Sequence, residues 1–88
     1  MSSENCISLE VILSEVETIQ KFYSIVSKVD YDVDMVRGRY VIDAKSIMGI
    51  YSLDLSKPIE VVLHCLNESQ YTHFIDELNN NNIKYKVV

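Results

Sequence analysis

The sequence predicts one α+β domain in which a four-stranded antiparallel sheet is covered on one face by three helices. Segments of alternating apolar and polar residues are interleaved with segments whose apolar residues recur every three or four positions, in the order β-α-β-β-α-β-α. The two longer helical segments each have one apolar face, so both can pack on the same side of the sheet. Since 88 residues support a single core, we expect one domain over residues 1–88.

The first strand is predicted from the alternation of apolar residues between Ile7 and Leu13. Ser14 then precedes a segment from Glu15 to Lys28 in which apolar residues recur at helical spacing. Ser14 and Glu17 match a capping box, in which each side chain bonds a backbone amide at the start of the helix. We therefore expect a helix over Glu15 to Lys28 that Ser14 caps.

A β-hairpin is predicted around Gly38. Alternating residues from Tyr31 to Met35 form its first strand, and Arg39 to Asp43 form the returning strand. Glycine adopts the positive φ that a tight turn requires, so Gly38 suits the turn between them.

The second half of the chain predicts a short helix, a strand and a longer helix. Ser46 can cap a short helix through Leu53, and Pro58 marks the entry to a strand from Ile59 to Leu66. Asn67 begins a second long helix whose apolar stripe is formed by Tyr71, Phe74, Ile75 and Leu78. Alternation in the last residues leaves open an extra C-terminal strand, carried by Ile83, Tyr85 and Val87.

Composition argues against several classes of partner. The net charge of −5 offers no basic surface for a phosphate backbone, so nucleic acid is not expected. No apolar run approaches the roughly 18 residues of a membrane span, and no signal peptide is evident, so we expect a cytoplasmic protein without a membrane partner. Cys6 and Cys65 are too few for a disulfide scaffold, and we expect both to be small buried hydrophobes. No metal site or other cofactor is predicted.

The most specific motif is Lys45-Ser46-Ile47-Met48-Gly49, within a segment from Asp43 to Leu53. This segment closely resembles the regulatory-serine region of HPr, the histidine-containing phosphocarrier of the bacterial sugar phosphotransferase system. The residues from Ser27 to Val33 also resemble the family's first helix end and second strand, in register and without a gap. The resemblance implies an HPr-like open-faced β-sandwich of four antiparallel strands and three helices.

The family's phosphocarrier chemistry requires a Gly-x-His-Ala-Arg-Pro motif, which this chain lacks. The resemblance places Glu15 at the histidine and Glu17 at the arginine. A carboxylate repels an incoming phosphate where a neutral imidazole would attack it, so we expect neither phosphoryl carriage nor enzymatic activity. His64 and His73 do not fit as substitute acceptors, because the first is predicted on the outer face of a strand and the second beside a helix stripe.

The resemblance implies that Ser46 is a phosphorylation site for an HPr kinase, in addition to its role as a helix cap. It also implies that Ile47, Met48 and Tyr51 form a face that binds a protein partner, such as HPr kinase or a LacI-type regulator. The residues alone leave a second interpretation open, in which Ile47 and Ile50 belong to the core and only Met48 and Tyr51 protrude. Asp54 stands where the family usually has glycine and adds a third acid near Glu15 and Glu17.

These observations predict an HPr-like protein without phosphocarrier activity that binds or regulates through the segment from Ser46 to Leu53. One alternative is a phosphotransferase-system component that uses another phosphoryl acceptor. Another is a structural module that forms oligomers through outward residues of the open sheet face, namely Ile12, Val36, Val41 and Val62.

Overall fold

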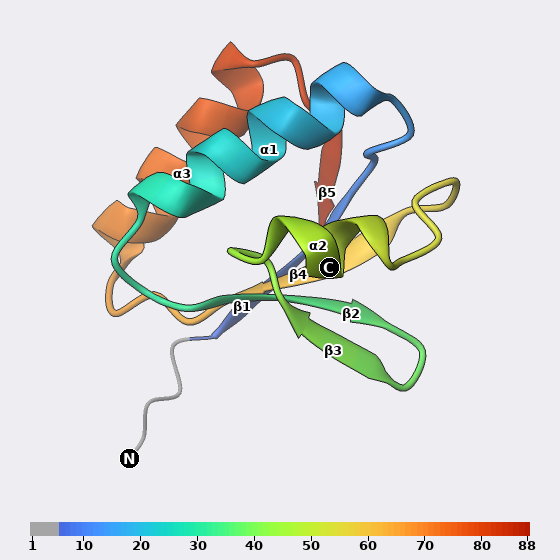
Figure 1. Ribbon diagram of the computed structural model, residues 1–88. Helices are drawn as coiled ribbons and strands as arrows, with labels where there is room; N and C mark the ends of the chain where they lie inside the picture. The colour runs from blue at the N-terminus through green and yellow to red at the C-terminus, as the bar shows by residue number, and fades with distance from the viewer. Residues whose placement is uncertain (1–5) are drawn as a thin grey trace.

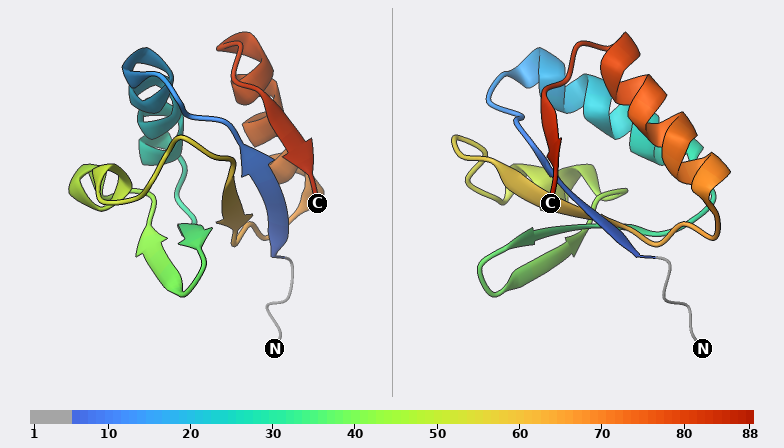
Figure 2. Two further views of the ribbon diagram at one scale, coloured as in Figure 1. Left: turned by 90° about the vertical axis from the view of Figure 1, so that its right-hand side faces the viewer. Right: turned by 180° about the vertical axis from the view of Figure 1, so that it is seen from behind.

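Five strands form one antiparallel sheet in the computed structural model, which describes residues 6–88. The strand order is β3-β2-β4-β1-β5, and α1, α2 and α3 lie on one face of the sheet (Figures 1 and 2). The elements along the chain are β1 (Ile7–Val11), α1 (Val16–Lys28), β2 (Val33–Arg37), β3 (Tyr40–Asp43), α2 (Ile47–Tyr51), β4 (Ile59–Leu63), α3 (Glu68–Asn80) and β5 (Tyr85–Val87). The predicted α+β class, with helices on one face of an antiparallel sheet, is confirmed.

The extra C-terminal strand that the sequence left open is present, because the C-terminal segment joins the sheet as β5 and makes five strands where four were expected. It pairs with β1 in the register Leu9↔Val87 and Val11↔Tyr85. Backbone hydrogen bonds extend the pairing at both ends, from the Ile12 amide to the Lys84 carbonyl at 3.1 Å and from the Val88 amide to the Ser8 carbonyl at 3.3 Å. The fifth strand therefore satisfies backbone groups that β1 would otherwise expose at a sheet edge.

The core lies between the sheet and the helices, and among the described residues it consists of hydrophobic side chains, including Tyr31. Alternation puts Leu9, Val61 and Met35 of three neighbouring strands on its lower side, where each is fully buried. Phe22 of α1 and Phe74 of α3 meet above them edge to face, with ring centroids 6.4 Å apart. All three helices contribute, because Ile50 of α2 is also fully buried.

The start of α1 differs from the prediction. The helix begins at Val16, and Glu15 occupies the N-cap position with extended backbone and no side-chain cap hydrogen bond. The Ile19 amide donates to the Glu15 carbonyl at 3.0 Å, so the first turn closes on Glu15 and leaves Ser14 outside it. The predicted capping box of Ser14 and Glu17 is therefore wrong.

The other predicted boundaries are close to those observed. Gly38 has φ +60° at the first position of the two-residue hairpin turn, and Ser46 and Asn67 cap their helices through side-chain oxygens. β4 ends at Leu63, earlier than the predicted Leu66, because the pairing with β1 and β2 in the sheet ends there. Within residues 6–88 no helix has the length and apolar character of a bilayer span.

Candidate functional site

Glu15 and Glu17 are exposed at the start of α1, and Asp54 is exposed in the loop after α2. The start of α1 and this loop lie at the same end of the molecule (Figures 1 and 2). Hydrogen bonds from the Ser56 hydroxyl and amide hold the pKa of Asp54 below its ordinary value, with smaller contributions from Arg37 and Lys57. The ion pair with Arg37 is 3.7 Å long and exposed. This end of the molecule therefore presents three exposed carboxyl groups.

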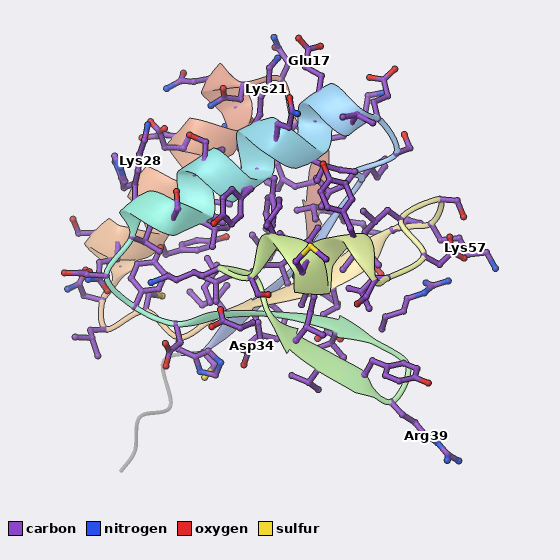
Figure 3. The ribbon with its side chains drawn as sticks, in the orientation of Figure 1. Glu17, Lys21, Lys28, Asp34, Arg39 and Lys57 are labelled. Atoms are coloured by element: carbon purple, nitrogen blue, oxygen red, sulfur yellow. The ribbon has the colours of Figure 1, made fainter. Side chains whose placement is uncertain are left out.

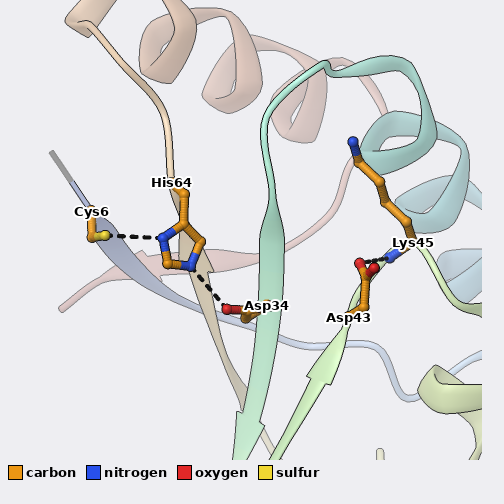
Figure 4. Close-up of polar contacts among 5 residues, drawn as sticks. All are labelled: Cys6, Asp34, Asp43, Lys45 and His64. Atoms are coloured by element: carbon orange, nitrogen blue, oxygen red, sulfur yellow. Dashed lines mark hydrogen bonds and ion pairs between the residues drawn. The ribbon is translucent and has the colours of Figure 1, made fainter. Parts of the chain in front are cut away.

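Ser46 is exposed, and its side-chain oxygen accepts a hydrogen bond from the Gly49 amide at 3.2 Å. The predicted capping role of this serine is thus confirmed. Its neighbour Lys45 is anchored at both ends: its amide donates to Asp43 Oδ1 at 2.9 Å (Figure 4), and its Nζ donates to the Val29 carbonyl at 2.8 Å. Because helix carbonyl ends carry partial negative charge, Lys45 stabilises the end of α1 and fixes the approach to Ser46.

The exposed face of α2 consists of two large apolar side chains. Met48 is 78% exposed and Tyr51 48% exposed, whereas Ile50 is fully buried and Ile47 is half-buried against the core. The structure therefore favours the second interpretation, in which Met48 and Tyr51 alone protrude. We call Ser46, Met48 and Tyr51 the α2 surface.

The backbone of α2 lies close to β3. A Cβ atom at Gly49 would lie 3.3 Å from Ile42 Cδ1, which is tighter than ordinary van der Waals contact. Strand alternation also places the exposed Tyr40 on the helix-bearing face of β3. Glycine thus allows the approach that holds the α2 surface in a fixed position.

The open face of the sheet is charged. Alternation directs Asp34, Asp43, Glu10, Glu60 and His64 away from the helices, and Figure 3 shows Asp34 on the far side of the sheet from Glu17, Lys21 and Lys28. Two like-charged pairs stand directly opposite each other on neighbouring strands, Asp34↔Asp43 and Glu10↔Glu60. Arg39 extends from the hairpin tip and Lys57 from the loop before β4, both away from these acids (Figure 3).

Cys6 differs from its predicted role, whereas His64 lies on the outer face of the sheet as predicted. Cys6 is exposed, so its predicted packing role is wrong, whereas Cys65 is buried as predicted. His64 is half-buried and makes two side-chain contacts, to Asp34 Oδ2 at 2.9 Å through Nε2 and to Cys6 Sγ at 3.1 Å through Nδ1 (Figure 4). Sequence alternation placed His64 on the outer face, but it could not show that β4 lies between β2 and β1.

His73 is exposed on α3, as predicted, beside a hollow of about 410 Å³ between α1 and α3 that Lys28 also lines. Across residues 6–88, no three His, Cys, Asp or Glu side chains are grouped so that they could hold a metal ion. No family model matches the chain, and a search among curated proteins finds no match.

Proposed function

We propose that this chain is an HPr-like protein without phosphocarrier activity that binds a protein partner through the α2 surface. The exposure of Met48 and Tyr51 on a helix whose other large side chains turn toward the core carries the proposal. Large apolar groups that a rigid element holds in solvent are typical of contact surfaces.

The positions of the acids and histidines support the loss of phosphoryl carriage. The start of α1 offers Glu15 and Glu17, whose charge repels a phosphoryl group. Both ring nitrogens of His64 are engaged, and Asp34 places a carboxylate beside that ring. Of the two histidines in the sequence, a carrier with another acceptor would therefore have to use His73.

Enzyme I and phosphoenolpyruvate test this part of the proposal. We expect no acid-labile phosphate on the chain, because neither the start of α1 nor His64 offers a neutral nucleophile that is accessible to the phosphoryl donor. Phosphate that arrives on the protein and disappears in His73→Gln would establish the carrier alternative instead.

Regulation through Ser46 follows from the same proposal. A phosphate on its exposed hydroxyl would stand at the start of α2 and replace a neutral cap with nearly two negative charges, within the α2 surface itself. We expect HPr kinase and ATP to modify wild-type protein and not Ser46→Ala. Ser52→Ala is the matched control, because Ser52 is an exposed serine at the opposite end of the same helix. Modification that persists in Ser46→Ala would leave Ser46 as a cap alone.

Binding of a LacI-type regulator, measured by calorimetry, tests the apolar part of the surface. Met48→Ser and Tyr51→Ser should each weaken binding at least about tenfold, as expected for central apolar contacts. Val41→Ser, at an exposed apolar position on the open face, is the control and should have no effect. Equal binding by all these proteins would contradict the proposed surface.

The open sheet face does not favour the oligomer alternative. Val36 and Val41 are cross-strand neighbours there, and Val62 lies on the next strand, but acids from four strand positions surround them. A second copy of the same face would bring like charges together, which costs free energy unless the charges are screened. Sedimentation at low and high salt should therefore give a monomer; a dimer at low salt would restore this alternative.

A further inference from the structure

Three side chains from neighbouring strands form a connected set on the open face. Cys6 immediately precedes β1, His64 immediately follows β4, and Asp34 lies in β2. The sheet order β2-β4-β1 puts His64 between the other two, 3.1 Å from Cys6 Sγ and 2.9 Å from Asp34 Oδ2 (Figure 4). The His64 amide donates to the Asp32 carbonyl at 3.0 Å, so the backbone that carries the imidazole is also fixed.

The contacts define what each group can do. With Asp34 accepting the Nε2 proton, the Nδ1 lone pair of His64 faces the Cys6 thiol and can take its proton. The product is a thiolate next to an imidazolium that the Asp34 carboxylate stabilises. A nucleophile, a base and a group that orients the base are the arrangement that activates cysteine in covalent chemistry.

We propose that Cys6 is a reactive thiol that exchanges with low-molecular-weight disulfides, with His64 as the base and Asp34 as a positioning residue. The Cys6 thiolate attacks one sulfur of R–S–S–R, and a new S–S bond forms as the original S–S bond breaks. The leaving thiolate takes the proton from His64 Nδ1. Cys6 is oxidised to a mixed disulfide and the reagent is reduced to one R–SH, so the step needs no other oxidant.

Access to the thiol differs sharply between the two cysteines. Cys6 is exposed and borders a hollow of about 340 Å³ that Cys65, Asn67 and Glu68 also line. Cys65 is only 2% exposed, and burial raises the pKa of its thiol. Reaction therefore belongs to Cys6, and Cys65 serves as an internal control.

The charge around the site selects among disulfides. Asp34 lies in β2 beside His64, and Asp32 comes just before that strand. Asp43 is paired opposite Asp34, and Glu68 borders the hollow. These carboxylates attract a cationic reagent and repel an anionic one. We infer that cationic disulfides such as cystamine are the preferred class.

The test is the second-order rate of mixed-disulfide formation with cystamine at pH 7, located by peptide mass spectrometry. Each rate is divided by that of the same protein unfolded in urea, which removes the intrinsic reactivity of the reagent. We expect one adduct on Cys6, lost in Cys6→Ser. His64→Gln should slow the reaction at least about tenfold, with the loss shrinking at pH 9, where hydroxide replaces the base.

Two further variants separate positioning from structure. Asp34→Asn should reduce the rate at pH 7 less than His64→Gln does, and His73→Gln, which changes an exposed histidine on α3, should not alter it. Dianionic dithiobis-nitrobenzoate should show a smaller folded-to-unfolded rate ratio than cystamine, with the difference falling as salt is added. Equal rates for wild type and His64→Gln, an adduct on Cys65, or an internal Cys6–Cys65 disulfide would overturn the proposal.

Discussion

The two faces of the sheet are built from alternate residues of the same strands, yet they differ completely in chemistry. Leu9 and Val61 on the covered face are fully buried, whereas Glu10 and Glu60, their neighbours in the chain, face solvent as a like-charged pair. The covered face provides the apolar burial that stabilises the fold. The open face holds the Cys6, His64 and Asp34 contacts. Because its side chains are exposed or half-buried, they can change with little loss of stability.

The largest expected difference between the faces comes from removing apolar volume. Phe74→Ala on the covered side should lower the free energy of unfolding by about 3–5 kcal/mol, because it leaves a cavity beside Phe22. Val62→Ala on the open face should cost about 1 kcal/mol or less, because this side chain is only half-buried. Urea denaturation measures both.

Phe74→Leu keeps the Phe74 comparison measurable if the alanine variant does not fold, and it should lose less stability than Phe74→Ala. Similar losses for Phe74→Ala and Val62→Ala would mean that the two faces contribute alike to stability.

A smaller effect is expected at Tyr31, whose hydroxyl is buried. Tyr31 is 9% exposed, and its hydroxyl makes no hydrogen bond with any group in the described part of the chain. A buried polar group without a partner costs about 1–3 kcal/mol, so Tyr31→Phe should raise the free energy of unfolding by about 1 kcal/mol at pH 7. Tyr40→Phe, at an exposed position, is the control and should change nothing.

The same residue makes stability depend on alkaline pH. Burial, with smaller effects of Cys65 and Asp30, raises the pKa of Tyr31 to about 12 from an ordinary 10.0. The unfolded chain releases this proton at lower pH than the folded protein does. The free energy of unfolding is therefore unaffected below pH 10 and falls between about pH 10 and 12, by at most about 3 kcal/mol. Tyr31→Phe should flatten this part of the pH profile, and an unchanged slope would contradict the burial of the hydroxyl.

The smallest effect concerns charge on the open face. Glu60→Gln removes one member of the Glu10↔Glu60 pair and should stabilise the protein by about 0.2–1 kcal/mol, less at high salt. Glu17→Gln removes the same charge from the first turn of α1 and should destabilise it by about 0.3–1 kcal/mol. Shifts of the same sign would show that net charge, and not position, governs stability.

Periodicity predicted most of this architecture because each signal was local. The alternation around Val61 and the stripe through Phe74 identified the buried side of each element, and Ser46 and Asn67 identified two helix starts. Ser14 is not the cap because the helix begins one residue later than predicted, at Val16, which puts Glu15 at the N-cap position. The spacing of the apolar residues does not distinguish these two starting points.

The Cys6, His64 and Asp34 contacts could not be predicted, because they depend on which strands are neighbours. Alternation placed His64 on the outer face, yet only the order β2-β4-β1 brings it between the other two. Cys6 was assigned to the core because cysteine is usually buried, whereas it stands just before β1 on the exposed side. Knowledge that β4 pairs with β1 in the observed register would have brought Cys6 and His64 together.

The order of strands in the sheet also governs when the protein can fold during its synthesis. β2 and β3 form a local hairpin, but β1 pairs only with β4 and β5, which come from the second half of the chain. Pairing of such distant segments must wait until both have been made. A nascent chain that has not yet reached β4 therefore displays the apolar sides of β1 and α1 to other chains, and truncation before Ile59 should give an aggregating fragment instead of a smaller folded domain.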